Sequence, residues 1–142
     1  MKAAWFESKG TEAEPDKFVI LVDTDGKDPD GVLAPLREEL PSRLRGLGPD
    51  VLFAFAQWHL EAWFFADHAG LRRYLKRSLG RVGAESPDQI TNPKLRLKHL
   101  LGDSVYTSRK SEEIAEALDP HVIRSQSPSF AGFVEAVRNG PE

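Results

Sequence analysis

The chain has no cysteine, no apolar run of membrane-spanning length and no Gly-x4-Gly-Lys phosphate loop. The absence of cysteine excludes disulfide bonds and thiolate metal ligands. Because the chain has neither a long apolar run nor a signal-peptide h-region, we expect no secretion or membrane insertion and predict a cytoplasmic protein. Without the phosphate loop, any ATP hydrolysis would have to come from a partner protein.

Apolar and charged side chains are present in ordinary amounts, at 40% and 29% of the 142 residues. These proportions are typical of a soluble, folded protein and argue against disorder as its main state. The length suits one domain with a substantial core and is short for two. We therefore expect a single domain over residues 1–142, and no internal repeat is visible.

The net charge of −3 hides a separation of charge along the chain. Residues 1–67 hold 7 Lys and Arg against 13 Asp and Glu, whereas residues 68–142 hold 12 against 9. Ten basic residues against three acidic ones lie between His68 and Lys110. Such a run is typical of solvated helix faces, but it also suits an anionic partner such as nucleic acid. The residues that we predict to contact nucleic acid are Arg72, Arg73, Lys76, Arg77, Lys94 and Lys110.

Four aspartates come directly after the apolar segment 18–22, and they are Asp23, Asp25, Asp28 and Asp30. Five consecutive apolar, largely β-branched residues predict a buried strand of a parallel sheet. In open α/β sheets, ligands gather where the carboxyl ends of the strands open onto loops. Aspartates this close repel one another unless a hard cation such as Mg²⁺ lies between them. The alternative is a solvated acidic turn, since Asp, Gly and Pro are common turn residues.

A second apolar segment, residues 51–56, predicts a second strand, and Glu61 comes shortly after it among aromatic residues. A buried, unpaired carboxylate is costly, so Glu61 should face water, pair with a base or point at a cation. If the two strands are neighbours, Asp23, Asp25 and Glu61 could reach one Mg²⁺ or Mn²⁺ ion and act in metal-dependent phosphoryl chemistry. The alternative is an ordinary salt bridge from Glu61 to Lys or Arg.

The remaining segments predict mainly helices. Apolar spacing and capping residues place them at 32–40, ending near the Leu40-Pro41 step, at 68–79 with Asp67 as cap, at 94–101, at 111–118 with Ser111 as cap, and from 127 onward. A loop rich in Gly, Ser and Pro is expected over 80–93 and a short edge strand over 121–124. Residues 1–15 predict a short helical or frayed lead-in. Because a buried parallel strand needs a neighbour on each side, an upstream β-α unit is expected to be missing.

Two other kinds of function fit parts of the same sequence. Residues 22–26 resemble the nucleophile loop of haloacid-dehalogenase-type phosphatases, in which Asp23 would be phosphorylated and Asp25 would act as acid and base. Lys27 counts against that interpretation, and together with Ala34 it excludes an EF-hand calcium loop. A non-catalytic interaction module with a vestigial acidic site is the other alternative. The histidines lack metal-ligand spacing and are expected to be structural or surface residues; they are His59, His68, His99 and His121.

Several segments, in this order along the chain, resemble a known bacterial family. They are the strand with Asp23-x-Asp25, the stretch Trp58-x-x-Glu61-Ala-Trp63-Phe-Phe-Ala-Asp67, Pro93-Lys94, Tyr106-Thr-Ser-Arg-Lys110 and Ser129-Phe130. Over residues 18–137 the chain resembles the family of domain of unknown function 4276, which is similar to Toprim domains. The resemblance implies a Toprim-like (Rossmann-like) α/β fold with a small, mainly parallel sheet flanked by helices.

The same resemblance implies a function. Toprim enzymes, including nucleases of overcoming-lysogenization-defect type, use an acidic metal site to cut or join nucleic acid strands. This implies a Mg²⁺- or Mn²⁺-dependent nuclease, and since related proteins occur in phage-defence loci beside ATPases, it also implies an ATPase partner. A Toprim site uses a further glutamate after an earlier strand, and no strand before Glu7 could place one here. We therefore expect the chain either to be amino-terminally truncated or to bind rather than cut.

Overall fold

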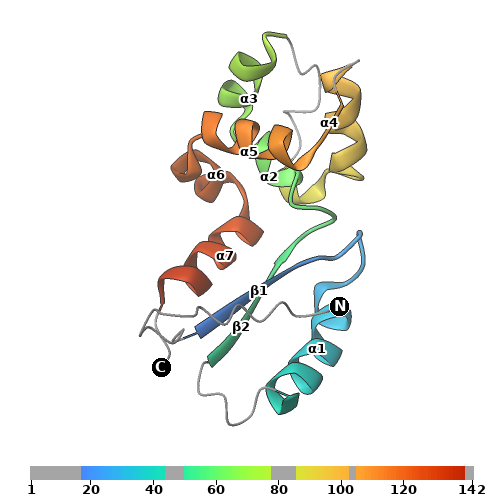
Figure 1. The fold of residues 1–142 in the computed structure, drawn as a ribbon, viewed down its shortest axis with the longest axis vertical. Helices are drawn as coiled ribbons and strands as arrows, with labels where there is room; N and C mark the ends of the chain where they lie inside the picture. Colours follow the sequence, from blue (N-terminus) through green and yellow to red (C-terminus); the bar gives the residue numbers. More distant parts are fainter. Residues whose placement is uncertain (1–16, 44–49, 78–85, 103–104, 140–142) are drawn as a thin grey trace, which may run out of the picture.

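The computed structural model describes residues 17–43, 50–77, 86–102 and 105–139, and over these residues the chain is a mixed α/β protein (Figure 1). Its strands are β1 (Lys17–Asp23) and β2 (Asp50–Ala56). Its helices are α1 (Pro29–Arg43), α2 (Ala62–Ala66), α3 (His68–Leu75), α4 (Pro93–Leu101), α5 (Ser108–Ala117), α6 (Pro120–Gln126) and α7 (Pro128–Arg138), with a 3-10 turn, η2 (Pro87–Gln89). None of the described helices has the length and apolar character that a membrane crossing requires.

The two strands form a parallel pair, as the prediction that they are sheet neighbours requires. Lys17 lies opposite Asp50, and Asp23 lies opposite Ala56, so both strands end at the same edge. Helix α1 makes the crossover between them, and such a connection is what parallel strands need. Within the described residues β1 has β2 as its one neighbour, whereas the sequence predicts a neighbour on each side. The lead-in predicted for residues 1–15 lies outside the described residues.

Helices α1 and α7 pack against the sheet and lie on either side of it in the view of Figure 1. The first residue of β1 is hydrogen-bonded to the end of α7. The Lys17 ammonium donates a 2.8 Å hydrogen bond to the carbonyl of Ala136. It also donates to the carbonyls of Val137 and Asn139. A cation at a helix carboxyl end is electrostatically favourable, so this contact fixes the last helix on the first strand.

The main apolar core lies in the helical half of the molecule, beyond the carboxyl ends of the strands. Helix α2 is buried along its whole length and meets α3, α6 and η2. The indole of Trp63 stacks on Phe133 with ring centroids 5.5 Å apart and meets Phe130 edge-on at 5.0 Å. Its Nε1 donates a 2.8 Å hydrogen bond to Ser129 Oγ, so this large apolar ring also has its polar atom satisfied.

The structure corrects four of the predicted elements, one in its type and three in their boundaries. The predicted edge strand over 121–124 is helix α6, because Asp119 accepts a 2.9 Å hydrogen bond from His121 N and Pro120 occupies the first helical position. Helix α1 continues through Pro41 to Arg43, since a proline in the last turn removes only its own backbone N–H from the helix. Helix α5 begins at Ser108, with Thr107 rather than Ser111 as its cap.

The fourth correction concerns helix α3. Asp67 caps it as predicted, with a 3.1 Å hydrogen bond from Gly70 N to Asp67 Oδ1. The helix ends at Leu75 rather than Leu79, because Lys76 adopts a left-handed conformation with φ of 54°. Of the loop predicted over 80–93, residues 80–85 lie outside the described residues, and the described part contains η2 and the start of α4. Helix α4 matches the predicted 94–101 within one residue.

Candidate functional site at the carboxyl end of the sheet

The loops after the two strands are bound to each other by backbone and hydroxyl contacts. Thr24 N donates to the carbonyl of Ala56 at 3.1 Å, and Thr24 Oγ1 accepts from Trp58 N at 3.1 Å. Asp25 N donates to the carbonyl of Trp58 at 3.0 Å. Thr24 is almost fully buried, so its hydroxyl has no water to compete for this bond. The acidic loop after β1 is therefore held in register with the residues that lead to Glu61.

The contact between these two loops includes two residues with a strained backbone. Asp25 and Trp58 both adopt positive φ angles, of 52° and 64°, which side-chain-bearing residues rarely do. Gly26 has a φ of 77°, and a Cβ atom added there would lie 2.5 Å from the ring of Trp58. Only glycine fits under this indole without a shift of either loop. Strain of this kind is common at functional sites, where the surrounding contacts over-determine the backbone.

Asp23 ends β1 and faces the residues that lead into α2. Its Oδ1 accepts a 3.0 Å hydrogen bond from Leu60 N. Partial burial raises the pKa of the Asp23 carboxyl above its ordinary value, and repulsion from Glu61 and Asp25 adds to this rise. The Leu60 N–H and the neighbouring His59 act in the opposite direction and lower that pKa. Asp23 and Glu61 are thus close enough for each charge to influence the other.

Asp25, the second predicted ligand, is more exposed and has a different partner. Its Oδ1 lies 3.1 Å from His59 Nε2, and two-thirds of its side chain is accessible. The other ring nitrogen of His59, Nδ1, is buried and has no hydrogen-bond partner among the described residues. The sequence predicts a structural or surface role for His59, whereas the structure places it within the acidic site.

Glu61, the third predicted ligand, is buried to 5% exposure immediately before α2. Its Oε1 accepts a 2.9 Å hydrogen bond from the Tyr106 hydroxyl, from the segment before α5. In the described part of the chain no Lys or Arg forms an ion pair with Glu61, so its hydrogen-bond partner is this phenol. Burial, together with the nearby Glu61 carboxylate, raises the pKa of Tyr106 to about 12, so this phenol stays protonated and can donate at neutral pH.

These carboxylates do not form a closed metal cage. Within the described ranges, no three His, Asp or Glu side chains are grouped closely enough to hold a metal ion. Asp23 and Glu61 come from neighbouring strand ends and interact, whereas Asp25 is turned toward His59. Two hard carboxylates fit the kind of Mg²⁺ or Mn²⁺ site in which water and substrate oxygens supply the remaining ligands.

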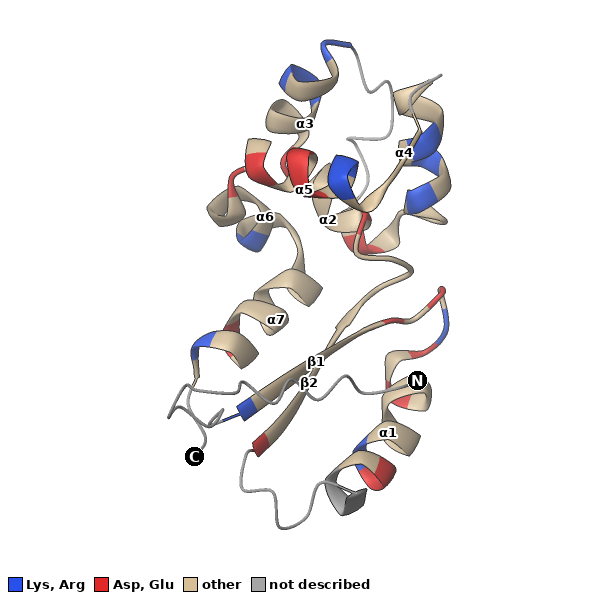
Figure 2. Ribbon diagram, viewed as in Figure 1, with Lys and Arg blue, Asp and Glu red and all other residues tan. Residues whose placement is uncertain are grey.

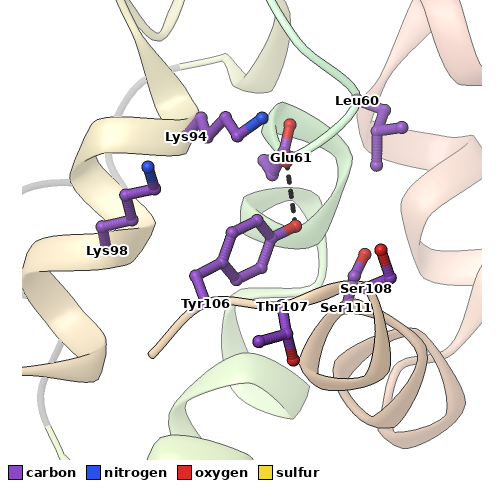
Figure 3. Close-up of a pocket in the computed structure, with 8 residues that line it drawn as sticks. All are labelled: Leu60, Glu61, Lys94, Lys98, Tyr106, Thr107, Ser108 and Ser111. Carbon is purple, nitrogen blue, oxygen red and sulfur yellow. Dashed lines mark hydrogen bonds between the residues drawn. The ribbon is translucent and has the colours of Figure 1, made fainter. Parts of the chain in front are cut away.

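A polar pocket of about 680 Å³ opens beside Glu61, between α4 and the start of α5 (Figure 3). Its lining residues are Leu60, Glu61, Lys94, Lys98, Tyr106, Thr107, Ser108 and Ser111. Lys94 and Lys98 lie one helical turn apart on α4, and in Figure 3 Lys94 extends toward Glu61. The carboxylate and the two ammonium groups therefore share one cavity.

The six residues predicted to contact nucleic acid lie on α3 and directly after it, on α4 and on α5 (Figure 2). Arg72 and Arg73 are exposed on α3, and Lys76 ends that helix. Arg77 Nη1 donates a 2.8 Å hydrogen bond to the Leu100 carbonyl, which joins α3 to α4.

The last two predicted contacts differ in whether they have a partner. Lys110 lies 3.4 Å from Glu113 and over the ring of Tyr74, so it is already paired. Lys94 lines the pocket, as does Lys98, which belongs to the basic run but is not a predicted contact.

The raised pKa of Asp23 predicts that Asp23→Asn stabilises the metal-free protein at about pH 7. A carboxyl whose pKa is raised in the folded state is less stable ionised there than in the unfolded chain. This penalty is present above the folded-state pKa and disappears as the pH falls below the unfolded one. The asparagine oxygen can still accept from Leu60 N.

Melting temperatures in EDTA at about pH 7 and about pH 3 test this prediction. The gain from Asp23→Asn should be present at the higher pH and absent at the lower. Asp50→Asn, at the opposite end of the sheet, is the control and should show no such gain. A lower melting temperature for Asp23→Asn at neutral pH would contradict the environment assigned to this carboxyl.

Comparison with protein families identifies the family of this chain's sequence. A family model described as Domain of unknown function (DUF4276) matches residues 6–138, which include every residue of the candidate site. No curated protein and no solved structure matches the chain.

Proposed function

We propose that this chain, which belongs to the family of domain of unknown function 4276, is a divalent-metal-dependent phosphodiester hydrolase of Toprim-like type that acts on nucleic acid. One observation carries the proposal. Parallel pairing brings Asp23 and Glu61 to one edge of the sheet, where their charges interact, and they adjoin a pocket with two lysines that form no ion pair within the described residues. An acidic site that can hold a cation next to a cationic pocket suits a phosphodiester, which is itself anionic.

Each residue has a proposed role. Asp23 and Glu61 would hold Mg²⁺ or Mn²⁺, and the ion would supply charge neutralisation at the phosphate and an acidified water. Tyr106 would orient Glu61 through its hydrogen bond. Asp25 is the third proposed ligand, and its carboxylate must exchange its contact with His59 for the ion. The ATPase partner and the phage-defence setting belong to the same proposal and rest on the family resemblance.

Mg²⁺ or Mn²⁺ should raise the melting temperature of the protein, because a ligand that binds only the folded state stabilises it. At a metal concentration of a hundred times Kd the gain is about 2.7 kcal/mol. Asp23→Asn should abolish this response, whereas Asp50→Asn, at the far end of β2, should keep it. Thermal melts with Mn²⁺, with Mg²⁺ and with EDTA measure the effect. A wild-type protein indifferent to millimolar metal would remove the basis for the metal site.

Cleavage assays then separate the three candidate functions. Metal-dependent cutting of labelled DNA or RNA, lost in Glu61→Gln, supports the hydrolase. Metal and strand binding without cleavage would assign the chain to the non-catalytic interaction module. Hydrolysis of a small phosphate ester with a phosphorylated Asp23 would assign it to the haloacid-dehalogenase-like phosphatases, because that chemistry passes through an aspartyl phosphate.

A further inference from the structure

We infer that the pocket between α4 and α5 is a binding subsite for a phosphate group of a nucleic acid strand. The inference rests on the proposed function, because it names the part of the substrate that lies beside the acidic residues. It requires no metal, so it can be tested separately. The observations that carry it are the two lysines, the hydroxyl groups opposite them and the size of the cavity.

The lysines provide the positive charge. Lys94 and Lys98 are four residues apart on α4, a spacing that places both side chains on one face of the helix. Both are exposed, and neither forms an ion pair with any described residue, in contrast to Lys110, which pairs with Glu113. Two ammonium groups and one carboxylate, Glu61, leave the pocket with a net positive charge. An anion that enters it would therefore meet uncompensated cations.

Hydroxyl groups provide the hydrogen bonds. Thr107, Ser108 and Ser111 line the pocket from the first turn of α5, and the Tyr106 hydroxyl lies beside them. Thr107 Oγ1 already accepts from Lys110 N at 3.2 Å, which leaves its own hydrogen available as a donor. Phosphate oxygens accept hydrogen bonds from Lys, Ser and Thr in this way. The cavity thus combines positive charge with hydroxyl groups in its wall.

The size of the cavity favours a strand over a free ion. Its volume of about 680 Å³ is about 23 times the ~30 Å³ that one water molecule occupies in the liquid, and it falls in the range of small-molecule sites. A nucleotide fits such a space, whereas an inorganic phosphate would leave most of it to solvent. Glu61 lines the pocket and also interacts with Asp23. A strand with one phosphate group in the pocket would therefore have its neighbouring phosphate group beside the proposed metal ligands.

The test measures binding of a short, fluorescein-labelled single-stranded oligonucleotide in EDTA, by anisotropy over a series of salt concentrations. Lys94→Gln combined with Lys98→Gln should weaken binding at least about tenfold and reduce the slope of log K against log salt by about 0.7, the single-strand value for one phosphate. Arg37→Gln combined with Arg138→Gln is the control. It removes two exposed positive charges from α1 and α7, away from the pocket, and should change affinity less than about twofold.

Three results would overturn the inference. The first is a wild-type chain that does not bind the oligonucleotide, and the second is a lysine double variant that binds as well as the control. The third is binding of inorganic phosphate or a nucleoside monophosphate as tightly as the oligonucleotide, which would identify a free small phosphate as the ligand. Failure of the metal response described above leaves this test unaffected, since all binding is measured in EDTA.

Discussion

Asp88→Ala is expected to destabilise the folded protein by about 3 kcal/mol, since it removes a charged acceptor from three hydrogen bonds. Asp88 Oδ1 accepts from the hydroxyls of Ser127 and Ser129, each at 2.8 Å, and Oδ2 accepts from Ser129 N at 2.9 Å. Ser127 and Ser129 are both buried, so each hydroxyl would lose its carboxylate acceptor in a place that water does not reach. Ser129 Oγ in turn accepts from Trp63 Nε1. The loss therefore reaches the aromatic core.

Urea denaturation gives the free energy of unfolding for this comparison. Asp119→Ala is the matched control, because Asp119 caps α6, is exposed, and its side chain accepts one 2.9 Å hydrogen bond, from His121 N. It should cost about 1 kcal/mol, as ordinary helix caps do. If the two variants lost the same stability, the Asp88 network would not be a main support of the fold.

Asp88 also shows what the sequence could not predict. It lies in a segment rich in Gly, Ser and Pro that predicts only a loop, and its serine partners are 39 and 41 residues away along the chain. Local patterns predict what local forces decide. The apolar segments 18–22 and 51–56 predict both strands, and Asp67 predicts its own helix cap, because each effect acts within a few residues.

The error at residues 121–124 has a different cause. Asp119-Pro120 predicts the stop of the preceding helix, but aspartate before proline is also a start signal for the next one. In the structure both effects operate, because α5 ends at Ala117 and α6 begins at Pro120. The buried Ile123 then anchors the new helix in the core. The sequence therefore contains the signal for α6, and a prediction that uses only the stop signal misses this helix.

The candidate site was also predictable only in part. Neighbouring parallel strands place the loops at their carboxyl ends on one edge of the sheet, so the pattern of the strands predicts the proximity of Asp23 and Glu61. Tyr106 could not be assigned to Glu61 from spacing, since 45 residues and several helices separate them. The contact of His59 with Asp25 depends on the positive φ of Trp58 and Asp25, which no local preference predicts.

The separation of charge along the sequence gains a structural meaning. The acidic half supplies β1, its aspartates and Glu61, while the basic half supplies α4 with Lys94 and Lys98. Folding brings Glu61 and the two lysines to one cavity, which Tyr106 also lines (Figure 3). This arrangement makes the Tyr106–Glu61 hydrogen bond the link between the acidic site and the pocket, and its strength is a measurable quantity.

A double-mutant cycle of Tyr106→Phe and Glu61→Met is expected to give a coupling energy of about 1.5–3 kcal/mol in metal-free protein at neutral pH, the range for a hydrogen bond to a charged group. Glu61 is 5% exposed and accepts at 2.9 Å, so its carboxylate is largely shielded from water that would compete with the phenol. The matched control is Tyr74→Phe with Glu113→Met. Tyr74 donates to Glu113 at 3.2 Å on the surface, and this pair should couple by about 0.5 kcal/mol or less.

A second readout separates a role in the site from a role in folding alone. Hydrogen bonds to a ligand carboxylate fix its orientation, so Tyr106→Phe should weaken the apparent Mn²⁺ affinity about 10- to 100-fold, whereas Tyr74→Phe should leave it unchanged. Both affinities are obtained from the metal dependence of the melting temperature. A strong coupling energy with unchanged Mn²⁺ affinity would make Tyr106 a structural partner of Glu61 only. A coupling no larger than that of Tyr74 and Glu113 would show that the buried carboxylate is held by something other than this phenol.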